Sequence, residues 1–328
     1  MGAARSYEQE VVVTSRPAGP ATLVLSASVA RRYYVDARSK LEIAEEFGLS
    51  RFKVARLIET ARASGLVRIE IGHKGRIDVD LSARIQAAFG LTHAVVVDTT
   101  DDDAEPVRTQ LGQVAAELLA EITSSDDVLG VAWSRSVGAM ARALPRLAAV
   151  PVVQLTGAIA MPDGDHSSID IVRDVARAAG GPAYVFYAPF TLPDAATARA
   201  LREQREVALA LGQLPRVTKA VVGVGAWAAG QSTLYDSARE HDRRALRSVG
   251  VCAEVSGVFL SADGEPVRTE LRERMIGIDA EQMRTIPEVI AISYGMAKVP
   301  ATRAALRSGL IDGLVTHTSF AQALLDAT

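Results

Sequence analysis

From about Leu81 onward, the chain alternates short apolar segments rich in β-branched residues with helical segments. The apolar segments predicted to be strands are HAVVVD (93–98), DVLGVAW (127–133), VPVVQLTG (150–157), PAYVFYAP (182–189), KAVVGVGAW (219–227), 251–259, VIAISYG (289–295) and GLVT (313–316). The helical segments between them include 107–122, 137–147, 169–179 and 195–211. This alternation is typical of a mainly parallel sheet covered by helices on both faces. It therefore predicts an α/β fold for most of the chain.

Ligands of such sheets bind beyond the carboxyl ends of the strands, so the segments that follow strands are the places to look for chemistry. In GVAWSRSVGAMARAL (130–144) a predicted strand ends at Trp133, and Ser134, Arg135 and Ser136 then begin a helix. Free backbone N–H groups and the helix dipole favour an anion there, and the side chains add further donors. Simple helix capping by Ser134 explains the same residues, so this stretch alone leaves both interpretations open.

Other predicted strands are followed or interrupted by residues that suit a binding site. Gly157 in LTGAI and Gly225 in VGVGAW would let a ligand approach the backbone, although a plain tight turn also explains each glycine. Glu254 interrupts the apolar segment VCAEVSGVF, and a buried carboxylate needs a ligand or an internal partner. Lys298 follows a strand and is a candidate for phosphate binding or a Schiff base, and Arg274 precedes another short strand. For the last two residues alone, a solvated surface position is the simpler interpretation.

The N-terminal part of the chain differs in pattern and in charge. Residues 1–20 lack periodicity and are expected to form a flexible arm. From residue 31 to residue 76 the chain has eleven Lys and Arg against six Asp and Glu, whereas its net charge is −3. A basic segment on an acidic protein suggests a polyanionic partner, although chance scatter in an arginine-rich chain gives the same balance. We expect residues 21–80 and 81–328 to form separate domains.

The segment KLEIAEEFGLSRFKVARLIE (40–59) meets the positional requirements of a helix-turn-helix. Ser39 and Glu42 have the spacing of a capping box, Ala44 is small enough for close helix packing, and Gly48 ends the first helix. On the first helix of the chain, about 21–36, the residues expected to face inward are Leu23, Leu25, Val29 and Tyr33. On the second helix they are Leu41, Ile43, Ala44 and Phe47.

Ser50 caps the next predicted helix, whose inward face is Val54, Leu57, Ile58 and Ala61. A recognition helix enters the major groove by its N-terminal residues. The residues expected to contact DNA are therefore Ser50, Arg51, Phe52, Lys53 and Arg56. Arginine can donate two hydrogen bonds to guanine, and phenylalanine can contact a thymine methyl group. A helical corner with a solvated basic face is the alternative, and the aligned positions favour DNA binding.

A hairpin after this helix would complete a winged helix. GLVRIEI (65–71) and IDVDL (77–81) alternate like strands around the turn GHKGR (72–76). His73, Lys74 and Arg76 at the tip would then contact phosphates. An ordinary exposed turn explains these three residues almost equally well.

No metal site, cofactor motif or export signal is recognisable. The five histidines lack ligand spacing, Cys252 lacks a companion, and Walker, G-x-S-x-G and intact G-x-G-x-x-G motifs are absent. The start MGAARSYEQE lacks an apolar signal region, and no apolar run approaches the ~20 residues of a membrane span. The single cysteine fits a reducing compartment. We therefore expect a cytoplasmic protein without metal or cofactor.

In order and spacing, many segments resemble motifs of the SorC family of sugar-responsive bacterial transcriptional regulators. They include YYVDARSKLEIAEEFGLSRFKVARLI, GLVRIEI, GVAWSRSV, VPVVQLTGAI, VVGVGAW, STLYDS, RMIGID, IPEVIAISYGMAK and ALRSGLIDGLVT. The resemblance extends from about Ser26 to the C-terminus. It implies a winged helix-turn-helix joined to a sugar-binding domain similar to the sugar-phosphate isomerase and deaminase fold. It also implies a sugar or phosphorylated sugar as effector, and usually a homotetramer.

Carried onto this sequence, the family's phosphate loop matches Arg135 and Ser136. Its sites after later strands match Gly225, Glu254, Arg274 and Lys298. The sequence departs from the family pattern at several places. Ser134 and Tyr294 stand where glycine is usual, Phe52 where proline is usual, Thr156 where asparagine is usual, and His317 where an acid is common.

The sequence therefore predicts a sequence-specific DNA-binding regulator of a carbohydrate-metabolism operon, controlled by a sugar or sugar phosphate. Its expected partners are operator DNA, the effector and further copies of itself, as a tetramer or a dimer, with no membrane partner. One alternative is an isomerase- or hydrolase-like enzyme with an appended DNA-binding domain, in which Glu254 and Lys298 supply acid–base chemistry. Another is an architectural DNA-binding protein with a vestigial body. The basic recognition helix argues against the enzyme.

Overall fold

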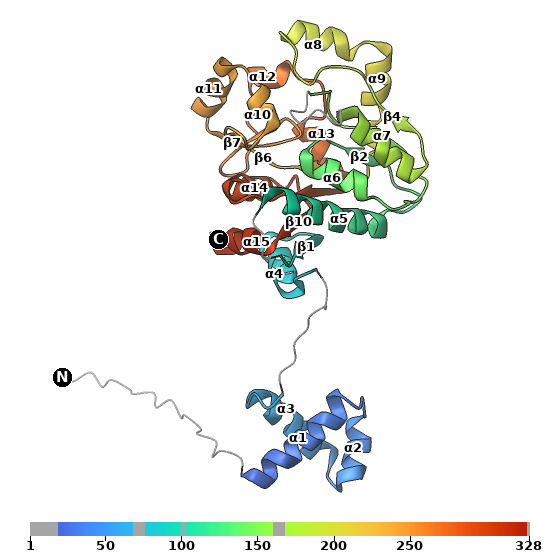
Figure 1. Cartoon of the computed structure of the whole chain (residues 1–328), viewed down its shortest axis with the longest axis vertical. Helices are drawn as coiled ribbons and strands as arrows, with labels where there is room; N and C mark the ends of the chain where they lie inside the picture. The colour runs from blue at the N-terminus through green and yellow to red at the C-terminus, as the bar shows by residue number, and fades with distance from the viewer. Residues whose placement is uncertain (1–18, 68–75, 100–102, 160–167, 327–328) are drawn as a thin grey trace, which may run out of the picture. The chain divides into compact units, whose positions relative to one another are not determined.

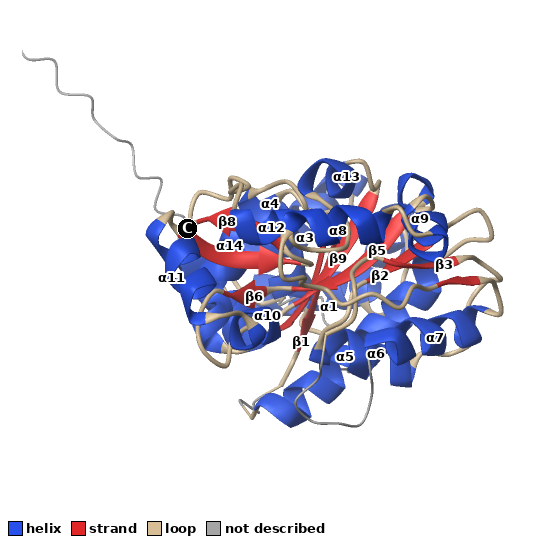
Figure 2. Cartoon of the chain, turned by 90° about the horizontal axis from the view of Figure 1, so that it is seen from above, coloured by secondary structure: helices blue, strands red, loops and turns tan. Residues whose placement is uncertain are grey.

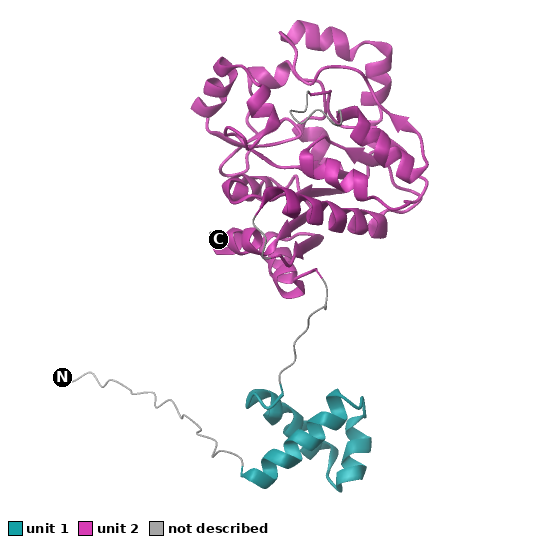
Figure 3. Ribbon diagram, in the orientation of Figure 1, with its two compact units in different colours: residues 1–71 teal, residues 72–328 magenta. Residues whose placement is uncertain are grey.

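The computed structural model describes residues 19–67, 76–99, 103–159 and 168–326. The chain divides into two compact units, residues 1–71 and 72–328 (Figure 3). This division precedes the expected domain boundary at residue 80. Most of the expected arm and the central part of the expected hairpin, including His73 and Lys74, lie outside the described residues.

The described part of the first unit contains three helices, which are labelled in Figure 1, and their buried side chains form a small core. They are α1 (Pro20–Tyr34), α2 (Lys40–Phe47) and α3 (Arg51–Ala63). The capping box of Ser39 and Glu42 is present, and Gly48 ends α2 in the left-handed conformation with φ 62°. Glycine adopts this conformation without the steric cost of a Cβ atom, which explains the sharp turn into α3. The predicted caps and turn are thus confirmed.

The core of this unit follows the predicted helix faces with two exceptions. Val29, Ile43 and Val54 are fully buried, but the predicted inward residues Leu23 and Leu41 are 43% and 59% exposed. Both leucines stand in the first turn of their helix, whereas the buried residues come further along, at Ser26, Val29 and Ala30 of α1 and at Ile43 and Ala44 of α2. Their prediction as core residues is wrong.

The predicted strand over 77–81 is also wrong. Ile77 forms a single antiparallel bridge with Val97, and Val79–Phe89 is helix α4 of the second unit. The Asp78 side chain accepts a hydrogen bond from the Leu81 N–H at 2.9 Å and so caps this helix. A helix cap therefore overrides the apolar alternation in this short segment.

The second unit is built on a parallel sheet of seven strands in the order β1-β10-β9-β5-β2-β3-β4. The strands are β1 (His93–Val97), β2 (Leu129–Val131), β3 (Val152–Gln154), β4 (Ala183–Tyr184), β5 (Lys219–Gly223), β9 (Glu288–Ile292) and β10 (Gly313–His317). All six pairings are parallel. The predicted mainly parallel α/β fold is confirmed.

Helices cover both faces of this sheet. One face is covered by α5 (Ala104–Ile122), α6 (Arg135–Ala143) and α7 (Ser168–Ala179), which lie together on one side of the strands in Figure 2. The other described α-helices of this unit are α4, α8 (Ala195–Arg202), α9 (Arg205–Leu211), α10 (Thr233–Ser237), α11 (Glu240–Ser248), α12 (Glu270–Glu273), α13 (Ala280–Arg284), α14 (Val299–Arg307) and α15 (Thr318–Asp326). The predicted helix over 195–211 is thus two helices.

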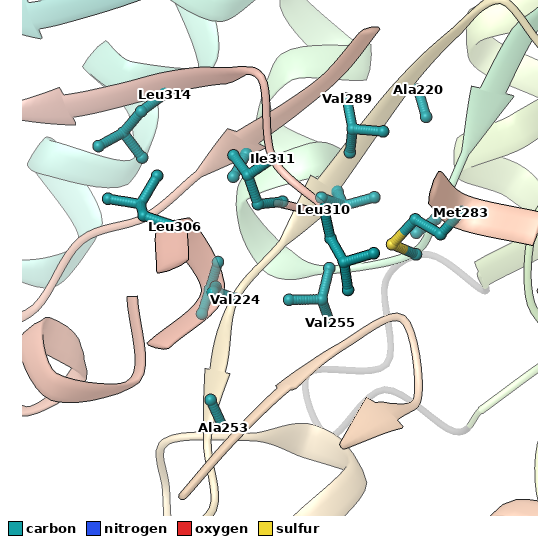
Figure 4. Close-up of a cluster of buried hydrophobic side chains, with 14 of the residues drawn as sticks. Ala220, Val224, Ala253, Val255, Met283, Val289, Leu306, Leu310, Ile311 and Leu314 are labelled. Carbon is teal, nitrogen blue, oxygen red and sulfur yellow. The ribbon is translucent and has the colours of Figure 1, made fainter. Parts of the chain in front are cut away.

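Successive strand residues belong to different cores. Val221 packs in the core under α5, α6 and α7, whereas Val222 packs in the core on the opposite face. Figure 4 shows this second core, in which Met283, Leu310 and Val255 lie close together. Burial on both faces explains why the strands are continuously apolar.

A small antiparallel sheet adjoins the second core. It consists of β6 (Gly225–Ala226), β7 (Val251–Val255) and β8 (Val258–Ser261). The single strand predicted for 251–259 is wrong, because Ser256 and Gly257 have φ of 52° and 80° and turn the chain into a hairpin. Two successive positive φ angles are the mark of a tight hairpin turn. Among the described helices, none combines the length and apolarity needed to cross a membrane.

Candidate functional site

A cavity of about 360 Å³ lies beyond the carboxyl ends of β2, β5 and β9, which are neighbours in the parallel sheet. Its wall consists of segments 133–136, 223–225, 230–233 and 294–298, together with Ala104, Arg108, Thr156, Glu254 and Ser256. This is the position at which parallel α/β sheets bind ligands.

Most of the sequence-predicted ligand residues meet in this cavity. Those that line it are Ser134, Arg135, Ser136, Gly225, Glu254 and Lys298. Gly157 and Arg274 do not line it. A Cβ at Gly157 would lie 2.7 Å from the Phe190 Cα, so this glycine allows two backbones to approach. Arg274 donates from Nη2 to the Asp242 carboxylate at 2.5 Å and forms an internal ion pair.

The start of α6 forms one end of the cavity wall. The Ser134 Oγ accepts a hydrogen bond from the Val137 N–H at 3.0 Å, so the predicted cap is present. The Ser134 and Ser136 hydroxyl oxygens are 3.0 Å apart, and Ser136 donates to the Ile292 carbonyl at 3.3 Å. Arg135 is exposed and forms no hydrogen bond or ion pair with a residue that the structure describes. Capping by Ser134 therefore leaves this guanidinium available to an anion.

Two glycines, one at the end of β5 and one at the start of β6, bring the walls of the cavity together. A Cβ at Gly223 would lie 2.8 Å from the Ser134 Oγ, and a Cβ at Gly225 would lie 2.3 Å from the Glu254 Oε1. Any larger side chain at either position would displace a polar group of the wall. The glycines thus serve close packing of the site.

Glu254 is buried and held by hydrogen bonds. Its Oε1 accepts from the Ser232 hydroxyl at 3.0 Å, and its Oε2 accepts from the Gly257 N–H at 3.2 Å. Burial raises the pKa of this carboxyl above its ordinary value, and the two hydrogen bonds and the nearby Lys298 oppose this effect. Within the described residues Glu254 has no arginine partner in an ion pair.

Lys298 lies in the wall with its amine enclosed by protein. Burial lowers its pKa to about 8; the Glu254 carboxylate opposes this shift, and the Arg135 guanidinium adds to it. The Nζ atom is 5.6 Å from the centre of the Tyr294 ring. It has no hydrogen bond or ion pair to any part of the chain that the structure describes.

Three further polar groups in the wall lack partners. The Trp133 Nε1, Thr156 Oγ1 and Ser256 Oγ atoms are buried and form no hydrogen bond within the described residues. Unsatisfied buried polar groups cost free energy, so a ligand that supplies donors and acceptors is favoured here. Such a ligand would carry several hydroxyl groups.

Sequence reasoning missed part of this wall. Arg108 comes from α5 and Ser256 from the β7–β8 turn, and neither has a local signal in the sequence. Ser232 falls in the quoted motif STLYDS, which was a usable signal. Of the departures from the family pattern in this unit, Ser134, Thr156 and Tyr294 line the cavity, whereas His317 does not.

The described residues contain no group of three or more His, Cys, Asp or Glu side chains arranged to hold a metal ion. The functional groups in the cavity wall are cationic side chains, hydroxyl groups and the carboxyl group of Glu254.

The tip of α3 is a second candidate site. Ser50 caps the helix, and Arg51, Lys53 and Arg56 are exposed, as is Phe52 at 86%. The opposite face, Val54, Leu57, Ile58 and Ala61, is buried as predicted. Arg76 does not belong to this surface, because it lies in the second unit and pairs with Glu117 of α5 at 3.0 Å. The predicted place of Arg76 at the tip of a wing is wrong.

Known proteins resemble the chain over most of its length. The Sugar-bind family, described as a sugar-binding domain, matches residues 76–326. The transcriptional regulator LsrR of Klebsiella pneumoniae is 28% identical over 327 residues, which cover 97% of this chain and 98% of that protein. The erythritol catabolism regulatory protein EryD of Brucella abortus is 28% identical over 307 residues, which cover 92% and 96%. The full-length sorbitol operon regulator SorC from Klebsiella pneumoniae matches in fold with a TM-score of 0.71 at 22% identity, covering 92% and 99%.

The lowered pKa of Lys298 predicts how stability depends on pH. Between about pH 8 and 10.5 the unfolded lysine binds more protons than the folded one, so stability rises with pH in this window. Between pH 7.5 and 9.5 the wild type should gain about 1–2 kcal/mol relative to Lys298→Met. Urea unfolding followed by tryptophan fluorescence measures this, because Trp133 and Trp227 both lie in the second unit. Equal pH dependence of the two proteins would show that the amine is not perturbed.

Proposed function

This chain belongs to the SorC family of sugar-responsive bacterial transcriptional regulators, and on that premise we propose that it binds operator DNA under the control of a phosphorylated sugar. The regulated genes would form a carbohydrate-metabolism operon, since EryD is named a regulatory protein of erythritol catabolism and SorC a regulator of the sorbitol operon. The protein would act in the cytoplasm, where the DNA is.

Unneutralised positive charge in the cavity carries the proposal of a phosphate. Arg135 and Lys298 both face it, and neither has an ion-pair partner among the described residues. The start of α6 adds backbone N–H groups and the positive end of a nine-residue helix. The Lys298 amine is enclosed, and an enclosed charge is costly without a counter-charge, which a phosphate dianion would supply. The exposed Arg135 would add charge-assisted hydrogen bonds.

The remaining wall suits the sugar itself. The Trp133 ring N–H can donate a hydrogen bond, and the Thr156 and Ser256 hydroxyl groups can donate or accept one. All three groups lack hydrogen-bond partners within the described chain. Glu254 and Ser232 add a hydrogen-bonded pair at the same wall. Sugar hydroxyls can pair with each of these groups, which explains why so many polar atoms surround one cavity.

The exposed tip of α3 supports the proposed DNA contact. Its two arginines and one lysine suit guanine edges and phosphates, and Phe52 offers an apolar surface to a thymine methyl group. The DNA-contacting residues we propose are thus Ser50, Arg51, Phe52, Lys53 and Arg56.

A sugar-phosphate isomerase-like enzyme is the second candidate, and Glu254 with Lys298 is the observation that favours it. Their perturbed pKa values, raised for the acid and lowered for the amine, suit proton transfer. We propose regulation instead, because the relatives are named regulators. Multiple turnover of a sugar phosphate by the pure protein would favour the enzyme.

The DNA proposal predicts distinct effects of three arginines on α3. Arg51→Ala or Arg56→Ala should weaken operator binding by about 1–3 kcal/mol and relax the preference at one base position. Arg62→Ala is the matched control, because it removes the same charge from the exposed last turn of the helix. Selection of bound fragments from random DNA measures both quantities. Unchanged preference in both test variants would remove the recognition-helix assignment.

One recognition helix contacts few base pairs, and this limit leads us to expect that the protein forms an oligomer. Specific regulation usually requires two half-sites, so we expect a homo-oligomer, either a tetramer or a dimer. Light scattering at micromolar concentration measures the mass with and without operator DNA. A monomer under both conditions would contradict this expectation.

The phosphate proposal predicts a specific loss in Arg135→Ala. This variant should bind a sugar phosphate roughly 10- to 100-fold more weakly, as expected for loss of a charge-assisted hydrogen bond, and should keep operator affinity in the absence of ligand. Arg142→Ala, in the last turn of the same helix and exposed, should retain both properties. Calorimetry with sugars and their phosphates measures the affinities. Tighter binding of a neutral sugar than of its phosphate would show that the site does not select phosphate.

A further inference from the structure

The cavity contains a primary amine whose chemistry the proposed function leaves unused. The chain has five lysines, and of the four that the structure describes, Lys298 is the one in the cavity wall. Lys40 and Lys53 belong to the first unit, and Lys219 pairs with Glu288 at 2.7 Å. The Lys298 amine, in contrast, has no hydrogen bond or ion pair with a described residue. A lysine that is enclosed, unpaired and beside a ligand cavity can act as a nucleophile.

We propose that the Lys298 Nζ captures the carbonyl carbon of an open-chain aldose or ketose phosphate as an imine, so that the effector is held by a reversible covalent bond. This inference rests on the proposed function, which places the phosphate of the same ligand at the start of α6.

The start of α6 and Lys298 line the same cavity, so one ligand can contact both. Although α6 follows β2, its Ser136 hydroxyl donates to the carbonyl of Ile292, the last residue of β9, at 3.3 Å. Lys298 lies in the segment that follows β9. A sugar chain in its open form, with its phosphate at the start of α6, can therefore present its carbonyl carbon to the amine.

The amine is prepared for this reaction by its surroundings. With a pKa of about 8, roughly a tenth of Lys298 is neutral at pH 7, whereas an ordinary lysine is neutral in less than about a thousandth of molecules. The neutral form is the one that attacks a carbonyl group.

Glu254 can carry the protons that the reaction moves. Attack by the Nζ lone pair and transfer of one proton from nitrogen to oxygen give a carbinolamine. Its hydroxyl group takes a proton from the Glu254 carboxylic acid and leaves as water while the C=N bond forms. The iminium nitrogen then returns its proton to the Glu254 carboxylate. The balance is one amine and one carbonyl converted to one imine and one water. Burial, which raises the pKa of Glu254, favours the acid form used in the second step.

The test uses two ligands that differ only at the reactive carbon. Erythrose 4-phosphate is an open-chain aldehyde, because phosphorylation of its terminal hydroxyl prevents ring closure. Erythritol 4-phosphate has the same phosphate and carbon chain but no carbonyl group. The full-length protein is incubated with each compound and sodium cyanoborohydride, which reduces an imine to a stable amine, and the labelled lysine is identified by peptide mass spectrometry.

We expect erythrose 4-phosphate to label Lys298 at least tenfold more than Lys40 or Lys53 in the same digest, and erythritol 4-phosphate to label nothing. Inorganic phosphate or erythritol 4-phosphate in excess should suppress this labelling, because they occupy the same cavity. The rate at Lys298 should level off above about pH 8, whereas the rate at Lys53 should keep rising. Lys298→Arg keeps the charge and should lose the label.

Two failures are distinguishable. If erythritol 4-phosphate or inorganic phosphate raises the melting temperature but erythrose 4-phosphate does not label Lys298 preferentially, the imine is excluded and the phosphate site stands. If neither compound raises the melting temperature and all lysines are labelled alike, both proposals fail. Because the mapping is done on the wild type, misfolding of a variant cannot obscure the result.

Discussion

Burial of the parallel sheet on both faces is the constraint on which the second unit depends. Val221 and Val222 are adjacent in β5, yet they pack into cores on opposite sides. With both faces covered, the ends of the strands are the places where the sheet can meet a ligand. The loops after β2, β5 and β9 converge there and bring Ser134, Gly225 and Lys298 to one cavity. The site is thus a consequence of strand order.

Much of this arrangement could be predicted from sequence because it depends on local rules. Continuously apolar segments, separated by helical segments, predicted the strands. Helix-capping residues predicted both helices of the helix-turn-helix, including the capping box of Ser39. The β7–β8 hairpin was missed although the Ser256–Gly257 dipeptide of VCAEVSGVF is a turn signal, because apolar residues on both sides of it suggested one strand. The apolar pattern fits one long strand and two short strands equally, so it does not decide between them.

The site shows the same limit. The criterion that a residue follows a strand selected Ser134 and Lys298, which do line the cavity. It also selected Gly157, which packs against Phe190 instead. Proximity to a strand end does not reveal the direction of a side chain. Arg108 was missed for the opposite reason, since it reaches the cavity from a helix that is distant in sequence. Contributions of this kind depend on how the elements pack.

The path of the chain between Gly223 and Gly225 has a consequence for dynamics. Gly223 ends β5 of the parallel sheet and Gly225 begins β6 of the antiparallel sheet, so Val224 is the one residue between these two strands. A molecule that contacts both Ser134 and Glu254 therefore bridges the two sheets where they meet. Occupancy would stiffen this joint and lower the conformational entropy of the second unit. Such a change can transmit a signal while the average positions of the atoms stay the same.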